Sequence, residues 1–254
     1  MVTGIHSEVK LEIYEWKPGG PDPVRPLGEH DVHVWHGPLN LFSPEIPRLR
    51  ELLSDDEKER AGRFHFEKNR NEYVLSRGRL RILLASYLST SPAELCFTYS
   101  THGKPSLNTP ARGATLAFNV SHTDVFAVCA FAWNRRVGID VERIRKNFDP
   151  EQIAERFFSA AERLALRNLP EEQRHEAFFR CWTRKEAYIK AIGEGLSHPL
   201  HQFDVSFTQE EPAALLGTRP DGAEAGRWWL REIPLPANYI AALAVEAGRT
   251  ASGE

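Results

Sequence analysis

Two acidic residues stand one position apart in the stretch VGIDVERI, residues 137–144, which otherwise has the composition of a buried strand. In a strand, residues i and i+2 point to the same face, so Asp140 and Glu142 project side by side while Ile139 and Val141 face the other way. Two adjacent carboxylates repel one another unless water solvates them or a cation lies between their oxygens. So short a motif, taken alone, is more often a plain strand with one wet face, and only its context favours a cation.

A third acid lies in FFRCWTRKEAYIKAIGEGL, residues 178–196, which is expected to be helical. Four of its residues fall at i, i+4 steps and so share one side of the helix: Phe178, Trp182, Glu186 and Lys190. A solvent salt bridge between Glu186 and Lys190 would explain the spacing. It would not explain the aromatic alignment, because a stripe carrying Phe and Trp is expected to face protein, where an acid needs a partner. A metal ion shared with the two strand acids would be such a partner, and three carboxylates suit Mg²⁺ or Mn²⁺ better than Zn²⁺.

Groups suited to phosphate binding are scattered through three earlier segments: SRGRLR (76–81), HGKP (102–105) and NVSH (119–122). Lys104 follows a glycine that lets the chain turn, and Arg77 offers a planar fork that fits a phosphate. No acidic run near these basic groups neutralises them. Each signal is weak alone, since the arginines could form a solvated helix face and His122 could be a turn histidine. Ser121 and His122 do not indicate a hydrolase, because neighbours on an extended chain face opposite ways and no G-x-S-x-G turn is present.

The composition excludes several classes of protein. The chain has 254 residues, 41% of them apolar and 26% charged, which suffices for one large or two small packed domains. A net charge of -3 argues against a nucleic-acid partner. Cys96, Cys129 and Cys181 lie in apolar contexts and are expected to be core thiols in a reducing cytoplasm. There is no leader-like start and no run of 18 apolar residues, so neither export nor a membrane partner is expected. P-loop, G-x-G-x-x-G and H-E-x-x-H motifs are absent, which removes support for kinase, dinucleotide oxidoreductase and zincin functions.

The order of expected elements occurs twice. After an irregular Pro/Gly-rich lead at 18–31, a strand from Val32 precedes two helices, at 55–66 and 71–88, and then the strand-like runs LCFTYS, TLAFNVSH and VFAVCAFAW. From Val137 a strand, helices around PEQIAERFF and in 170–193, and the strands FDVSFT, RWWLREI and YIAALAVE follow. FTYS corresponds to FDVS, and VFAVCAFA to YIAALAVE. We therefore predict an α+β fold of two similar halves, 1–136 and 137–254, a pseudo-dimer with a cleft where the halves meet.

Two segments outside this plan receive no function. The stretch QEEPAALLGTRPDGAEAGR, residues 209–227, is predicted to be a mobile turn between strands. The Ala/Gly-rich tail after Val245 has no expected role.

Together, in this order and spacing, the motifs resemble those of the 4′-phosphopantetheinyl transferases of the surfactin-synthetase-activating type. The resemblance rests on GKP, FNVSH, VGIDVE and FFRCWTRKEAYIKAIGEGL, with RFFSAAE beside them, and extends from about Val32 to Val245. It implies two similar α+β halves with the site between them. It also implies an enzyme that moves the phosphopantetheine arm of coenzyme A onto a serine of an apo acyl or peptidyl carrier protein and releases adenosine 3′,5′-bisphosphate. Two fused halves further predict that a monomer can build the cleft, for which a single half would need a partner.

The resemblance further implies roles for individual residues. The metal ligands would be Asp140, Glu142 and Glu186, holding Mg²⁺, with Mn²⁺ as an alternative, against the pyrophosphate. Glu186 would also be the base that takes the proton of the carrier serine, directly or through water, and Lys190 would contact the phosphates as the second catalytic residue. The coenzyme A contacts would be Arg77, Lys104, Ser121, His122, Lys185 and Lys190.

Two other functions stay open from the residues alone. One is a non-catalytic module that holds coenzyme A or a carrier protein, although the presence of all three acids favours an enzyme. The other is a metal-dependent nucleotide pyrophosphatase that uses the same acids. Formation of product from coenzyme A only when a carrier protein is added would distinguish the transferase from the pyrophosphatase.

Overall fold

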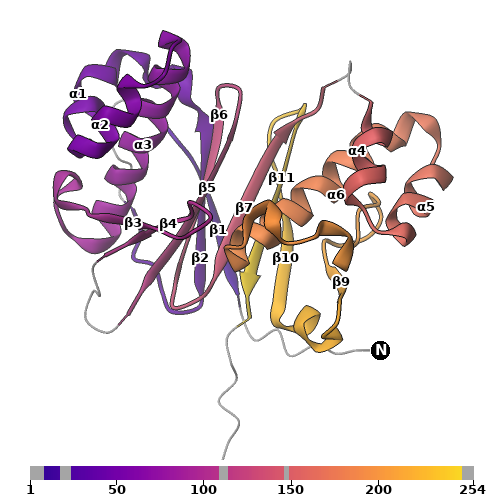
Figure 1. Ribbon diagram of the computed structural model, residues 1–254. Coiled ribbons are helices and arrows are strands. Elements are labelled where there is room, and N and C mark those ends of the chain that lie inside the picture. Colours follow the sequence, from indigo (N-terminus) through magenta and orange to yellow (C-terminus); the bar gives the residue numbers. More distant parts are fainter. Residues whose placement is uncertain (1–8, 18–23, 109–113, 146–148, 248–254) are drawn as a thin grey trace, which may run out of the picture.

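The computed structural model describes residues 9–17, 24–108, 114–145 and 149–247. Two sheets stand face to face at the centre of the molecule, with helices on the outer side of each (Figure 1). The helices of the first half cover one sheet and those of the second half cover the other. The predicted α+β class and the two similar halves are thus confirmed.

The first half begins with two strands and ends with two more, with helices and a short hairpin between them. Its elements are β1 (Lys10–Glu15), β2 (Asp31–Pro38), the 3-10 helix η1 (Leu39–Glu45), α1 (Ile46–Glu51), α2 (Asp55–Gly62), α3 (Glu67–Leu88), η2 (Pro92–Glu94), β3 (Phe97–Tyr99), β4 (Pro105–Leu107), β5 (Leu116–Thr123) and β6 (Phe126–Trp133). The sheet order is β1-β2-β6-β5, in which β1 runs parallel to β2 and the other pairs are antiparallel. The helix α2 begins after Ser54, whose N–H donates to the Glu57 carboxylate at 3.1 Å, as in a capping box.

The second half repeats this plan. Its elements are β7 (Val137–Arg143), α4 (Pro150–Phe157), α5 (Ala160–Asn168), α6 (Glu171–Ile192), η3 (Gly195–Ser197), η4 (Leu200–Gln202), β8 (Phe203–Val205), β9 (Leu215–Thr218), η5 (Gly222–Arg227), β10 (Trp228–Ile233) and β11 (Tyr239–Glu246). The sheet order β10-β11-β7 reproduces β5-β6-β2 of the first half. Each half also lays one 22-residue helix, α3 or α6, over its sheet.

The strands β6 and β11 are apolar on both faces because each lies between a helix layer and the opposite sheet. In β6, Cys129 packs toward the helices of its own half, whereas Val128 packs toward the second sheet. In β11, Ala242 faces its helices and Leu243 faces the first sheet. Matching VFAVCAFA to YIAALAVE residue by residue would pair Cys129 with Leu243, which face different layers. The two strands correspond as predicted, but the residue-by-residue match between them must be shifted by an odd number of residues. A shift of one residue moves every side chain of a strand to the other face of its sheet.

Other expectations need correction. The helix after Ser54 ends at Gly62 and does not reach Phe66, and β1, α1 and β4 had no expected counterpart. The stretch 209–227 contains β9, which pairs with β8, and the short helix η5, so it is more than a turn. Residues 24–30 of the lead hold no helix or strand, as expected, and 18–23 lie outside the described residues, as do 248–254 of the tail.

The cysteines and the helices bear on the expected setting. Cys129 and Cys181 are buried thiols, but Cys96 is exposed and is not part of a core. Among the described residues, no helix has the length and apolar composition needed to cross a membrane.

Candidate active site

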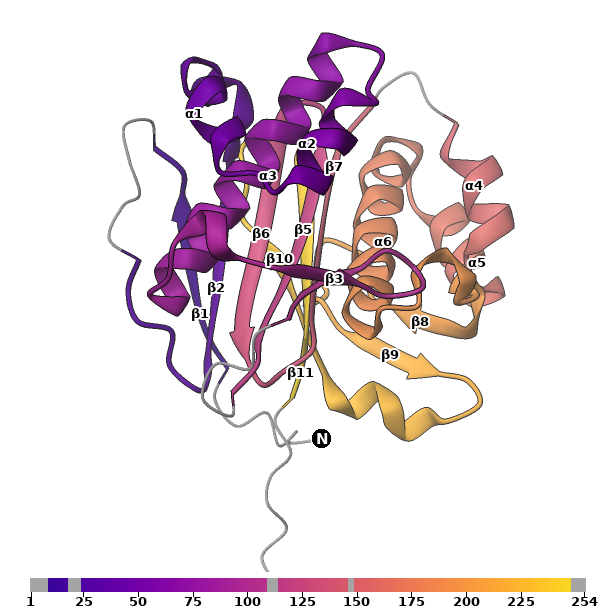
Figure 2. The same ribbon diagram turned by 60° about the vertical axis from the view of Figure 1, so that its left-hand side comes forward.

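The two halves meet where β5 and β7 lie side by side (Figure 2). The backbone of β7 bonds to side chains of β5: Ile139 N–H donates to Asn119 Oδ1 at 2.9 Å, and Val141 N–H donates to Ser121 Oγ at 3.4 Å. Both bonds join residues 20 positions apart, so the strands run in the same direction. This seam brings the NVSH segment of the first half against the acidic strand of the second.

A charged cluster lies at the seam. Asp140 is 4% exposed, and its Oδ1 accepts hydrogen bonds from Lys190 Nζ at 2.6 Å and from Ser121 Oγ at 2.9 Å. Lys190 Nζ also donates to Ser121 Oγ at 3.0 Å. One hydroxyl offers one donor and two acceptor positions, so Ser121 is saturated by Asp140, Lys190 and the Val141 N–H and is not a free nucleophile. Asp140 Oδ2 is buried and has no hydrogen-bond partner among the described residues.

The absent side chain of Gly138 allows Lys190 to reach Asp140. A Cβ at Gly138 would lie 2.1 Å from the Ala187 carbonyl oxygen and 2.3 Å from the Ala191 backbone nitrogen. Any larger residue would push α6 off β7, because these neighbours are helix backbone and cannot turn aside. The glycine of the VGID motif therefore allows the close approach of β7 and α6.

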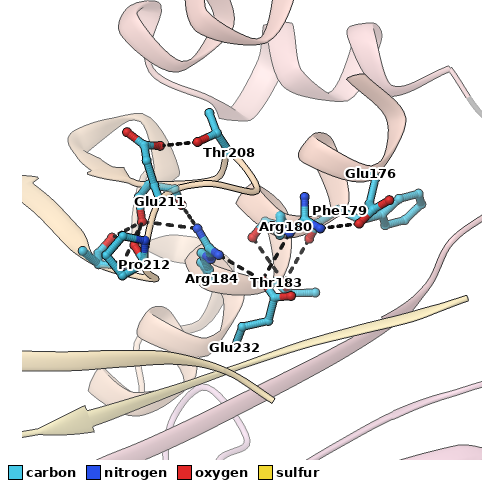
Figure 3. Close-up of polar contacts among 11 residues, drawn as sticks. Glu176, Phe179, Arg180, Thr183, Arg184, Thr208, Glu211, Pro212 and Glu232 are labelled. Atoms are coloured by element: carbon cyan, nitrogen blue, oxygen red, sulfur yellow. Dashed lines mark hydrogen bonds and ion pairs between the residues drawn. The ribbon is translucent and has the colours of Figure 1, made fainter. Parts of the chain in front are cut away.

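The rotation of α6 about its axis is fixed by two arginines (Figure 3). Arg184 donates to the Ser206 carbonyl oxygen at 2.6 Å and to Glu232 of β10 at 2.9 Å. Arg180, one turn earlier, contacts the same Glu232 at 3.2 Å. These bonds tie one side of α6 to β10 and to the 206–212 loop, which leaves Glu186 and Lys190 on the side toward β7.

Two glutamates at the seam have a raised proton affinity. Burial, followed by the charge of Asp140, raises the pKa of Glu142 to about 7 and that of Glu186 to about 7. Lys190 partly offsets the effect at both residues. At neutral pH each glutamate is therefore close to half-protonated, and a cation placed among the three acids would favour their ionised forms.

The donor set fits a hard divalent cation in its chemistry. All three side chains offer oxygen, and the unpartnered Asp140 Oδ2 is a ligand atom without a competitor. Within the described part of the chain, however, no three acid, histidine or cysteine side chains are gathered into a ready ligand set. The glutamate side chains would have to turn toward Asp140, where Lys190 now neutralises one oxygen.

A cleft of about 820 Å³ opens beside the cluster and is lined by both halves. This volume is within the range of about 300–1,000 Å³ found for small-molecule and cofactor sites. His122 and Glu142 line it, and so do four basic residues: Arg60, Lys68, Arg77 and Arg145. Burial and the charge of Lys190 lower the pKa of His122, so its imidazole is neutral at pH 7 and can still donate one hydrogen bond.

Arg77 lines the cleft but is also bound to protein. Its Nε donates to Glu57, its Nη2 donates to Tyr99 Oη at 2.7 Å, and its guanidinium stacks on Phe97 at 3.8 Å. Glu57 is 1% exposed and also accepts from Arg81 Nε at 2.6 Å. Although burial opposes it, these two arginines lower the pKa of Glu57. The expectation that no acid neutralises the basic groups is therefore wrong, and the helix face they form is buried, not solvated.

The two other candidate lysines do not point into the cleft. Lys104 Nζ donates to three backbone carbonyls, and burial, with a smaller effect of Arg136, lowers its pKa to about 8. Lys185 is fully buried, with Glu162 Oε2 at 2.8 Å and the carbonyls of Leu200 and Phe203 at 2.8 and 2.6 Å. Its ammonium ties α6 to α5 and to β8. The expected contact of Lys185 with coenzyme A is therefore corrected to a structural role.

Sequence reasoning missed several residues that build the site. Glu57 accepts a hydrogen bond from Arg77. The only signal for Glu57 in the sequence is its position three residues after Ser54, which is typical of a capping residue. Asn119 and Gly138 stood inside the quoted motifs but had no assigned role. Arg60, Lys68 and Arg145 line the cleft and belong to no motif.

Comparison with known proteins finds relatives that cover both halves of the chain. A sequence model described as the 4′-phosphopantetheinyl transferase superfamily matches residues 136–244, and one described as 4′-phosphopantetheinyl transferase, N-terminal, matches 42–134. The 4′-phosphopantetheinyl transferase HetI of Nostoc sp. is 38% identical over 232 residues, which cover 91% of this chain and 94% of the relative. Sfp of Bacillus subtilis is 28% identical over 171 residues, 67% of this chain and 73% of the relative. The holo-[acyl-carrier-protein] synthase of Thermotoga maritima has a TM-score of 0.33 and 22% identity, and covers 44% of this chain and 63% of that one.

Two fused α+β halves that close on a buried aspartate beside a basic cleft, together with this near full-length similarity, show that the chain belongs to the 4′-phosphopantetheinyl transferase family. It is an enzyme of that family. Within it, the two fused halves and the similarity to Sfp show the surfactin-synthetase-activating type, which confirms the resemblance found in the motifs.

Proposed function

We propose that this enzyme moves the 4′-phosphopantetheine arm of coenzyme A onto a serine of an apo acyl or peptidyl carrier protein, with Mg²⁺ or Mn²⁺, and releases adenosine 3′,5′-bisphosphate. The observation that carries the proposal is Asp140, buried at the seam between the halves with one oxygen neutralised by Lys190 and the other unpartnered. An orphaned carboxylate oxygen is costly to bury, so its retention points to a ligand that completes it.

The cleft supports coenzyme A as the donor substrate. Its lining contains the four basic residues as well as Glu72, Asp124 and Glu142. The basic residues could bind a molecule that carries a pyrophosphate and a 3′-phosphate, because charged guanidinium and ammonium groups are strong donors to phosphate. Arg60, Lys68 and Arg145 come from α2, from α3 and from the chain after β7, so the charges surround the cleft on several sides. His122 would add a neutral donor near Lys190.

The three acids would hold the metal ion, which when bound would stabilise the charge that develops on the pyrophosphate. Lys190 is partly exposed on its side chain, at 28%, so its ammonium can serve Asp140 and a phosphate oxygen in turn. These groups stabilise charge and fix geometry, which is most of what a phosphoryl transfer asks of a protein.

Glu186 would accept the serine proton, directly or through a water. In the transfer, the serine Oγ forms a bond to the phosphorus nearer the pantetheine, and the bond from that phosphorus to the bridging oxygen breaks. The bridging oxygen leaves with adenosine 3′,5′-bisphosphate, and the serine proton passes to the Glu186 carboxylate. A base must be ionised to accept the proton, and a cation held by the three acids would favour that form of Glu186.

We also propose that the enzyme acts as a monomer in the cytoplasm. A single chain supplies both walls of the cleft, so no second copy is needed to complete it. The described cysteines are free thiols, as expected in a reducing compartment.

The test is incubation with coenzyme A, MgCl₂ and a panel of apo-carrier proteins, with the mass of each carrier as the readout. We expect at least one carrier to gain the phosphopantetheine mass, and Asp140→Asn to lower the rate about a hundredfold or more, as is typical when charge stabilisation of a transition state is lost. Release of adenosine 3′,5′-bisphosphate in the absence of any carrier would instead identify a pyrophosphatase. Turnover of Asp140→Asn at the wild-type rate would refute the assignment of the site.

A further inference from the structure

We infer that Lys104 is a positioning residue for this reaction: its ammonium clamps the start of β7 to the end of α6, and it does not bind the phosphates of coenzyme A. The inference rests on the proposed transfer and assigns Lys104 a role opposite to the one its motif implies. Four features of the structure support it.

The first is the saturation of the ammonium group. Lys104 Nζ donates to the carbonyl oxygens of Val137 at 3.2 Å, Lys190 at 2.5 Å and Ala191 at 3.0 Å. An ammonium has three N–H donors and no acceptor, so each donor is already used. A phosphate could be bound only by breaking contacts that are partly buried.

The second is the place of the accepting carbonyls. Those of Lys190 and Ala191 belong to the last turn of α6, where carbonyls lack intrahelical partners and the helix dipole is negative. A cation at that end of a helix is stabilised by both effects. Although burial lowers the pKa of Lys104 to about 8, the ammonium form therefore still dominates at pH 7.

The third is the way in which the lysine is presented. The turn between β3 and β4 is closed by Ser100, whose N–H donates to the Lys104 carbonyl at 3.0 Å and whose Oγ accepts from the Lys104 N–H at 3.1 Å. This turn packs on two glycines that follow α6 and have positive φ, Gly193 at 81° and Gly195 at 58°. A Cβ there would lie 3.5 Å from Lys104 Cδ and 3.6 Å from His102 Cβ respectively. The AIGEGL segment of the second half thus forms the surface on which this turn of the first half packs.

The fourth is proximity to the reacting groups. Val137 precedes Gly138, where strand and helix touch, and Asp140 follows on the same strand. Lys190 accepts from Lys104 through its backbone while its own side chain donates to Asp140 at 2.6 Å. Without the clamp, the end of α6 loses its tie to β7 next to the Asp140–Lys190 pair, and a displacement of about 1 Å in a catalytic group can cost about a hundredfold in rate.

The experiment compares Lys104→Met and Lys104→Arg with the wild type, and uses Lys58→Met as a matched control on the exposed face of α2. Turnover is measured at saturating coenzyme A and carrier, and the Kd of coenzyme A is measured by calorimetry without carrier. We expect both Lys104 variants to lose about tenfold or more in kcat while the Kd stays within about threefold of wild type. Arginine should not rescue, because a planar guanidinium cannot meet three carbonyls that converge on one nitrogen, whereas it would serve a phosphate well. The control should match the wild type in both measurements.

Three results would overturn the inference. One is a rise of about tenfold or more in the Kd of coenzyme A with unchanged kcat, which is the behaviour of a pure binding contact. Another is full activity of Lys104→Arg, which would show that charge alone suffices. The third is a Lys104→Met variant equal to wild type in both constants. If Lys104→Met does not fold, the same two constants of Lys104→Arg decide.

A purely structural lysine is distinguished by the calorimetric stoichiometry. It would lower the melting temperature and the fraction of enzyme that binds coenzyme A, but not the turnover of each binding-competent molecule. Failure of the proposed function is also separate, because then the wild type itself modifies no carrier.

Discussion

The two halves bury a polar network at the same place and make different use of it. In each half the network lies on the helix-facing side of a strand, beneath the last turns of the 22-residue helix. In the first half, Tyr87 of α3 accepts from Trp35 Nε1 at 2.9 Å and lies 2.9 Å from His33 Nδ1, with both partners on β2. In the second half, Lys190 of α6 holds Asp140 of β7.

The two networks differ in charge, although each contains one buried atom without a hydrogen-bond partner among the described residues, His33 Nε2 in the first and Asp140 Oδ2 in the second. Burial lowers the pKa of His33 and raises that of Tyr87, so both stay neutral at pH 7 and their network is uncharged. The second network contains the Asp140 carboxylate, one oxygen of which has no partner in the described part of the chain. Two glutamates that interact electrostatically with Asp140 have a pKa of about 7. The repeated frame thus carries a neutral network in one copy and, in the other, a charged network with acids that could bind a cation.

The largest effect is expected from Glu186→Gln, which keeps the shape of the second network and removes one charge. If Glu186 is the base, the single-turnover rate on pre-bound apo-carrier should fall about a hundredfold to ten-thousandfold, while carrier affinity changes little. Glu176→Gln, on an exposed part of the same helix, is the control and should transfer at the normal rate. A Glu186→Gln rate near wild type would leave Asp140 and Glu142 as the only acids that matter.

The next largest effect is expected for Arg77, which would bind the 3′-phosphate of coenzyme A from the first half. Arg77→Ala should weaken coenzyme A by about 1.5 to 3 kcal/mol and dephospho-coenzyme A much less, because only the former has a 3′-phosphate. It should also lower the free energy of unfolding, since buried Glu57 then keeps only Arg81. Calorimetry with both ligands and urea unfolding measure these effects. Equal losses for the two ligands would assign Arg77 to the Glu57 and Tyr99 contacts alone.

Addition of Mg²⁺ should stabilise the protein more at pH 8 than at pH 6. In the metal-free protein, Glu142 and Glu186 have a pKa of about 7, above the 4.5 of an unperturbed glutamate. The folded state then binds more protons than the unfolded state, so the contribution of these groups to stability falls as the pH rises from about 4.5 to about 7. A cation that binds the ionised acids reverses this loss, by about 2.7 kcal/mol at a hundredfold excess over its Kd. Melting temperatures with and without MgCl₂ at both pH values test this, and a shift that is equal at both, or unchanged in Asp140→Asn, would contradict it.

The smallest effect on activity is expected in the first network. Tyr87→Phe leaves the Trp35 Nε1 donor without its acceptor and should cost about 1 to 3 kcal/mol in unfolding free energy. Turnover per folded molecule should not change, because the bonds of this network join residues of the first half and none of them involves Asp140, Lys190 or a residue that lines the cleft. A loss of activity without a loss of stability would mean that the first network takes part in the reaction, and would contradict the assignment of a purely stabilising role to it.

Much of the fold could be predicted from the sequence because its periodic patterns are strong. The apolar runs of β6 and β11, the i, i+4 stripe of α6 and the repeated order of elements fixed the class and the two halves. The odd shift between β6 and β11 could not be seen, since both strands are apolar on both faces and carry no alternation. Strands of three residues such as β3 and β4 are too short to show a period.

The site was less predictable where its partners are distant or belong to the backbone. The three acids and Lys190 stood in motifs with distinctive spacing. By contrast, the carbonyls that hold Lys104 carry no residue-specific signal, and Glu57 is 20 positions from Arg77. The placement of Lys185 was misjudged because Glu186, the next residue in the motif, lies on the side of α6 toward β7, although one residue along a helix turns the side chain by about 100°.

The seam between β5 and β7 also bears on how the chain avoids wrong partners. Both are edge strands of their sheets, and an open edge can recruit almost any extended segment, since backbone pairing is indifferent to sequence. Here the Ile139 and Val141 N–H groups are accepted by the side chains of Asn119 and Ser121. Because the two halves cover each other's edges in this way, neither β5 nor β7 offers an open backbone edge to a foreign strand in the folded chain. The seam that assembles the active site therefore also protects the folded protein against aggregation through these two edges.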